Sequence, residues 1–193
     1  MDSTVEIVPM HCRQIETTFG RRSDGLFEIE GRLLDTKAHA FRRQLAAEDS
    51  PPGTPLHRIS VRLVVDADLV VHEATAELAT TPFETCRGAE QSLFPLNGMR
   101  IGPGWIKRVK NVLGGPMSCT HVLELLGPMA TTAFQGLAPM RIARINAPGN
   151  GAERRKKVDS CFAYAAQRDV VTRLWPELYK PKEPPVEHAI YKD

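Results

Sequence analysis

The sequence predicts an α+β fold in which an antiparallel sheet of two hairpins is covered on one face by helices. Apolar and polar residues alternate through the first part of the chain, which is the period of a half-buried strand. After Pro82 the apolar residues follow a helical spacing instead. Strands that precede helices in this way are typical of α+β proteins.

The first hairpin is expected from residues 13–19 and 26–34, since Gly20 and a Ser-Asp-Gly turn lie between them. Phe27, Ile29 and Leu33 alternate there with charged residues. The second hairpin is expected from residues 59–65 and 70–78, with Asp66-Ala67-Asp68 as its turn. The sheet face that carries Glu28, Glu30, Arg32 and Arg62 should stay in water unless a partner covers it.

Four helices are expected after the strands. The first two span residues 84–94 and 105–113, and the third begins at Ser118 as its N-cap and runs to 134 with a kink at Pro128. The last covers residues 158–174 and ends before Pro176. We therefore expect one domain over residues 1–175 and a loose polar tail over residues 176–193.

The composition of the chain narrows the class of protein. Its 193 residues are 42% hydrophobic, and its net charge of +2 is too small to indicate a nucleic-acid partner. No apolar run is long enough to span a membrane, and the N-terminus lacks a secretory pattern. We expect a cytoplasmic protein with no membrane partner and with reduced thiols. Cys12 and Cys161 then fit buried small hydrophobes.

Cysteine and histidine at the predicted ends of elements indicate a metal site. Cys86 and Cys119 lie at expected helix starts, where the helix dipole favours the thiolate form that binds metals. His121 follows Cys119, and His57 precedes the strand 59–65. Zinc suits two thiolates and two imidazoles, with iron or an iron–sulfur cluster as the alternative. The alternative for Cys119 and His121 is a buried thiol beside a surface histidine.

A general base is the next candidate. Because Cys119 and His121 are two residues apart, one of them should miss the ion, which leaves an open position for water and makes His121 a catalytic candidate. Glu30 or Glu124 could then act as the base. Asp35 and Lys37 have the opposite strand parity to Glu30 and Arg32, so a converging acid–base group in residues 30–37 needs a bulge near Gly31. Cross-strand salt bridges explain the same residues without catalysis.

The run Leu56-His57-Arg58-Ile59-Ser60-Val61, the segment Thr85-Cys86-Arg87-Gly88 and the helix that starts at Cys119 resemble the NifU-type iron–sulfur assembly scaffolds. The resemblance covers roughly residues 55–135. It implies a NifU-like core, with His57, Cys86 and the Cys119/His121 pair at the positions of the metal ligands.

A second resemblance covers nearly the whole chain. The motifs Arg21-Arg22-Ser23-Asp24-Gly25, Glu30-Gly31-Arg32-Leu33-Leu34-Asp35-Thr36-Lys37, Ser118-Cys119-Thr120-His121 and Asp159-Ser160-Cys161 resemble a bacterial family known only as a domain of unknown function. The resemblance implies a setting in aromatic or acyl-thioester catabolism, with a small acyl or aromatic substrate, and it implies no reaction.

Three functions remain open on this evidence. The first is a metal-binding protein of that catabolism, either a metal-dependent hydrolase or lyase or an accessory protein. The second is a metal-free thioester or lactone hydrolase with Cys119 as nucleophile and His121 as base. The third is a non-catalytic binding module that uses the exposed sheet face, through which a homo-oligomer could also form.

Overall fold

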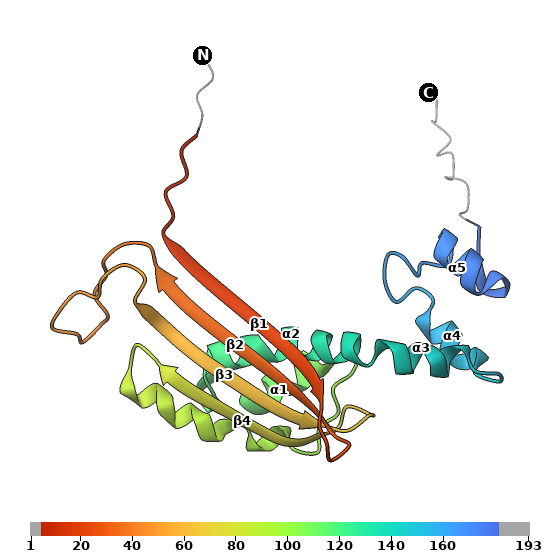
Figure 1. Cartoon of the computed structure of the whole chain (residues 1–193), viewed down its shortest axis with the longest axis horizontal. Helices are drawn as coiled ribbons and strands as arrows, with labels where there is room; N and C mark the ends of the chain where they lie inside the picture. Colours follow the sequence, from red (N-terminus) through yellow and green to blue (C-terminus); the bar gives the residue numbers. More distant parts are fainter. Residues whose placement is uncertain (1–4, 182–193) are drawn as a thin grey trace, which may run out of the picture. The chain divides into compact units, whose positions relative to one another are not determined.

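A computed structural model of the chain describes residues 5–181, and its first part is an antiparallel sheet (Figure 1). The four strands are β1 (His11–Arg21), β2 (Phe27–Lys37), β3 (Pro55–Val65) and β4 (Val71–Thr80). They lie in the order β1-β2-β3-β4, so every strand pairs with its neighbour in the sequence. The alternating pattern thus predicted the strands, and the α+β class is confirmed.

Helices cover one face of this sheet (Figure 1). They are the 3₁₀ helix η1 (Glu84–Leu96), α1 (Trp105–Leu113), the 3₁₀ turn η2 (Gly115–Met117) and α2 (Thr120–Gly136). The expected stripe of α2 is buried, including Val122, Leu125 and Met129. Within residues 5–181 every helix is too short or too polar to cross a bilayer.

Ser118 is not the N-cap of α2, contrary to the sequence prediction. The cap position is Cys119, without a side-chain bond to the helix. The Ser118 hydroxyl instead lies 2.6 Å from the Ser92 hydroxyl of η1. A hydrogen bond between two segments therefore replaces the local cap that a single-sequence pattern favours.

Contacts group the chain into two compact units, and the first ends at Leu137, inside the range expected to be one domain. The second unit contains α3 (Ala138–Asn146), α4 (Gly151–Lys157), α5 (Asp169–Leu174) and the short η3 (Pro176–Leu178). Residues 182–193, most of the predicted tail, lie outside the described residues.

The predicted helix over residues 158–174 is wrong for residues 158–168, about three turns, because only α5 is helical there. Asp159 adopts a positive φ of 60°, which ends the preceding helix. Its carboxylate accepts a bond from the backbone N–H of Ala166 at 2.8 Å, and this bond holds the intervening loop. A local side-chain to backbone bond has outcompeted the helix.

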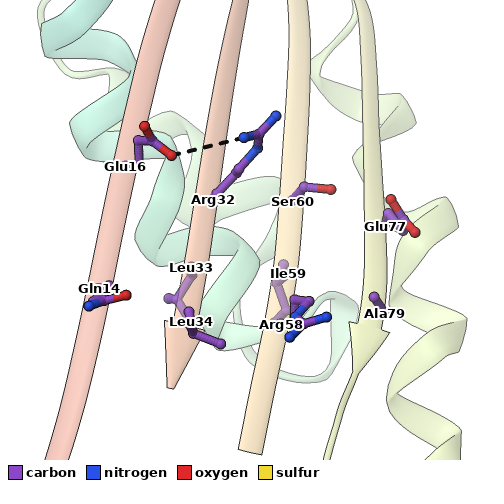
Figure 2. Close-up of a pocket in the computed structure, with 10 residues that line it drawn as sticks. All are labelled: Gln14, Glu16, Arg32, Leu33, Leu34, Arg58, Ile59, Ser60, Glu77 and Ala79. Atoms are coloured by element: carbon purple, nitrogen blue, oxygen red, sulfur yellow. Dashed lines mark ion pairs between the residues drawn. The ribbon is translucent and has the colours of Figure 1, made fainter. Parts of the chain in front are cut away.

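The uncovered sheet face carries charges, as predicted. Glu16, Arg32, Ser60 and Glu77 form a row across the four strands (Figure 2). Arg32 pairs with both Glu16 and Glu30, and a hollow of about 510 Å³ lies over this part of the sheet. Exposed pairs of this kind contribute little to stability. Association of two copies through this face stays a prediction.

Helix α2 packs closely on the covered face because two glycines leave room for it. A Cβ at Gly31 of β2 would come within 2.8 Å of Met129, and a Cβ at Gly136 would overlap the ring of Phe19. Gly127, also in α2, has only an ordinary contact at 3.6 Å with Ile106. The seating of α2 on β1 and β2 thus depends on the absence of a side chain at Gly136.

We predict that Gly136→Ala lowers the free energy of unfolding by about 1 to 3 kcal/mol, because the added methyl group must displace an aromatic ring. Gly127→Ala is the matched control in the same helix. It should be neutral or stabilising by up to about 1 kcal/mol, since alanine favours the helix. Urea denaturation of the two variants measures the difference, and equal effects would show that α2 is not seated in this way.

Candidate metal centre

A row of three polar side chains crosses the helix-covered face near one end of the sheet. Arg13 of β1 pairs in register with Asp35 of β2, and Asp35 pairs with His57 of β3. Asp35 continues the buried positions of β2, which carry Ile29, Gly31 and Leu33 before it. Its carboxylate therefore occupies a place where the pattern would otherwise put an apolar residue.

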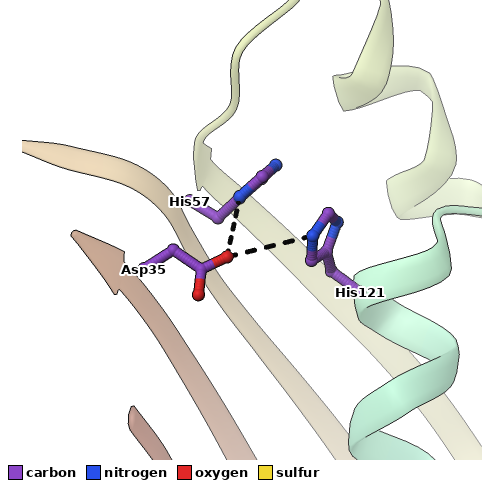
Figure 3. A group of neighbouring side chains, drawn as sticks. All are labelled: Asp35, His57 and His121. Carbon is purple, nitrogen blue, oxygen red and sulfur yellow. Dashed lines mark hydrogen bonds and ion pairs between the residues drawn. The ribbon is translucent and has the colours of Figure 1, made fainter. Parts of the chain in front are cut away.

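The first two turns of α2 complete the group from above the sheet. His121 Nε2 lies 3.9 Å from Asp35 Oδ2, and Glu124 binds the guanidinium of Arg13. His57 Nδ1 lies 2.9 Å from the same Oδ2 atom. Figure 3 shows both imidazoles directed at the Asp35 carboxylate, one from β3 and one from α2.

Asp35 is the most heavily bonded side chain of the group, with no exposed surface. Arg13 donates to both of its oxygens at 2.7 Å, and His11 Nε2 lies 3.2 Å from Oδ1. Burial alone would raise the pKa of this carboxyl. The bonds and the charge of Arg13, helped by the two histidines, outweigh burial and lower the pKa to about 2.

His57 is held in its neutral form by its surroundings. It is 8% exposed, and burial lowers its pKa below the usual value despite the opposing effect of Asp35. Its ring stacks on that of His121, with centroids 3.8 Å apart. Neutral imidazole is the form that binds metal ions.

Asp35, His57 and His121 could hold a metal ion together. One ligand atom from each lies within 4.8 Å of the other two, and no other such group of three occurs among residues 5–181. A transition metal bound at about 2.0 to 2.2 Å needs ligand atoms roughly 3 Å apart, so a small closure would suffice. Two imidazoles and one carboxylate form a set that binds zinc or ferrous iron.

The structure separates the four ligands expected from the sequence. His57 and His121 lie together, but Cys86 and Cys119 are outside the group of three. Both cysteines line a neighbouring pocket of about 410 Å³ between η1 and the start of α2. Cys119 Sγ lies 3.7 Å from His121 Nδ1, the ring atom that faces away from Asp35.

Burial and hydrogen bonds act in opposite directions on the thiol of Cys119. Burial raises its pKa, but the bond with His121 and the backbone N–H groups at the start of α2 outweigh it, and the net pKa is lowered. Cys12 and Cys161 are exposed, so the expectation that they pack as small hydrophobes is wrong. Cys12 lies in the edge strand β1, and Cys161 lies in the loop that takes the place of the first part of the predicted helix 158–174.

Of the two candidate bases, only Glu124 reaches this group, through Arg13. Glu30 lies on the charged face in a pair with Arg32, as the salt-bridge alternative anticipated. The bulge near Gly31 that a converging acid–base group would need is absent from the described strand, whose register is regular there. The register shifts between Asp35 and Thr36 instead, next to the candidate centre.

The sequence pattern did not identify Asp35, Arg13 or His11 as site residues. A signal for Asp35 existed, because its parity matches that of Ile29 and Leu33 and a charge on the core face needs a partner. No comparable signal marks Arg13 and His11, since β1 alternates weakly and its residues are largely exposed.

Residues 11–135 match the family described as a protein of unknown function (DUF2889), and the chain belongs to this family. The matched range begins at His11 and includes every residue of the candidate centre. No curated protein and no solved structure matches the chain significantly. The predicted membership of a domain-of-unknown-function family is thus confirmed over residues 11–135, and the motif Asp159-Ser160-Cys161 lies outside the matched range.

In metal-free protein, Asp35→Asn should lower the free energy of unfolding by about 2 to 4 kcal/mol, because it removes the carboxylate that Arg13 and His57 share. Glu30→Gln breaks the ion pair with Arg32 on the exposed sheet face, and it should change the free energy of unfolding by less than about 0.5 kcal/mol. Urea denaturation with EDTA present compares the two. Similar losses would contradict the central place given to Asp35.

Proposed function

We propose that the protein is a metal-dependent enzyme with one divalent transition-metal ion held by Asp35, His57 and His121. The observation that carries the proposal is the convergence of three ligand atoms from β2, β3 and α2 within 4.8 Å. Buried polar side chains are costly unless they are bonded, and Asp35 and His57 are the two buried polar residues of the described chain. Both belong to the proposed ligand set, and they lie 2.9 Å from each other.

The donor set supports zinc or ferrous iron over an iron–sulfur cluster, because clusters are held by thiolates. Three protein ligands leave coordination positions for water or substrate, as in catalytic centres. Arg13 would support the ion from the second shell by fixing the carboxylate through both oxygens. A role in aromatic or acyl-thioester catabolism remains part of the proposal, and the cytoplasmic location stays a prediction.

A NifU-like scaffold function is a separate proposal for residues 55–135. It would place Cys86 and Cys119 in the ligand set together with the histidines. A cluster would give an absorbance band in the visible range, which zinc does not give.

A metal-free thiol hydrolase is the second candidate, and one observation favours it. Cys119 and His121 lie 3.7 Å apart beside the 410 Å³ pocket, and the pKa of this thiol is lowered. On this alternative, Cys119→Ser abolishes thioester hydrolysis and EDTA has no effect on it. If the protein is instead a metal-dependent enzyme, EDTA abolishes its activity because it removes the ion.

We predict near-stoichiometric zinc or iron in protein purified without a metal-affinity tag. Asp35→Asn, His57→Ala and His121→Ala should each reduce the metal content at least about 10-fold, the loss typical of a missing ligand or of its immediate support. Inductively coupled plasma mass spectrometry measures the content. The measurement is made on dialysed protein whose folding is verified by circular dichroism.

Cys86→Ser and Cys119→Ser are the matched controls, and both should keep the metal. Loss of metal from the two cysteine variants, with retention in Asp35→Asn, would favour the thiolate ligand set instead. A folded wild-type protein that binds no added zinc or iron would refute the proposed centre.

A further inference from the structure

The chemistry at the mouth of the candidate centre points to the kind of molecule that binds there. Asp35 is fully buried, whereas the side chains of Arg13 and His11 are about one-third exposed. These two side chains therefore present a guanidinium and an imidazole to solvent next to the buried carboxylate. The guanidinium of Arg13 offers hydrogen-bond donors to an anion.

Arg13 has donors to spare for such a molecule. Its bonds to Asp35 and Glu124 use three of its N–H groups. A guanidinium carries five, arranged in a planar fork that matches a carboxylate. Two N–H groups are thus not used by these two acidic residues.

The charges of the group lead to the same conclusion. Without an ion, one positive charge on Arg13 faces one negative charge each on Asp35 and Glu124, which leaves one negative charge. Metal-ligating imidazoles are neutral, so a divalent ion changes this balance to one positive charge. Excess charge in a partly buried site is costly, and one bound monoanion removes it.

We propose that the metal-loaded centre binds a small monocarboxylate, held by the ion and by Arg13, as its substrate or product class. This inference rests on the proposed metal ion. The metal-loaded centre has one surplus positive charge, which one carboxylate neutralises. A phosphate dianion would leave the centre with one negative charge, so a carboxylate is favoured. Glu124 acts against the ligand in this arrangement, because it repels the incoming anion and occupies Arg13.

The test uses the full-length protein loaded with Co²⁺, with benzoate as the probe. The visible absorption of Co²⁺ changes when a ligand enters its coordination sphere, so a titration gives the affinity without an activity assay. Benzoate should bind, and benzamide, which has the same shape without the charge, should bind at least about 10-fold more weakly. Inorganic phosphate should bind more weakly than benzoate.

Two variants should move the benzoate affinity in opposite directions. Arg13→Gln should weaken it about 10-fold or more, and Glu124→Gln should strengthen it about 3- to 10-fold. Arg32→Gln on the opposite sheet face is the control and should leave it unchanged. Glu124→Gln keeps the test decisive if Arg13→Gln does not fold.

The outcomes separate this inference from the metal proposal. Failure of the protein to take up Co²⁺ refutes the proposed centre and this inference with it. Uptake of Co²⁺ followed by equal responses to benzoate and benzamide, or no gain in Glu124→Gln, refutes the carboxylate inference alone. Tighter binding of phosphate than of benzoate also overturns it.

Discussion

The arrangement of this end of the sheet depends on the buried carboxylate of Asp35. An ionised side chain on the core face of a sheet is costly unless charged and polar partners surround it. Arg13 supplies the opposite charge from β1, His57 donates from β3, and His121 approaches from α2. Because Asp35 is buried, the neighbouring strands and the covering helix must provide charged or polar side chains next to it.

The helix that completes the group is positioned by packing far from it. Helix α2 approaches the sheet closely at Gly31 and Gly136, and its apolar stripe fills the space above β2. These contacts fix the height of the helix over the sheet, and this height decides how near His121 comes to Asp35. The geometry of the polar group therefore depends on how the apolar side of α2 packs on the sheet.

The sequence predicted the sheet well because alternation is a local signal, and Phe27, Ile29 and Leu33 carry it without tertiary information. It predicted the helix 158–174 poorly, because the Asp159 bond that ends the helical path depends on a loop seven residues long. His57 and His121 were identified by their places at element ends. Asp35, the acidic partner of both histidines, was not identified as a metal ligand. The residues that surround Asp35 depend on which strands lie side by side, and this is a property of the tertiary structure.

The members of the candidate centre are far apart in the chain. Arg13 and Glu124 are separated by 111 positions, and every strand from β1 to β3 contributes before α2 closes the group. Contacts of such long range cost conformational entropy, because the chain between them must close into a loop. An ion that bridges α2 and the sheet would bind only the completed fold, and it would couple docking of this helix to the folding equilibrium of the whole first unit.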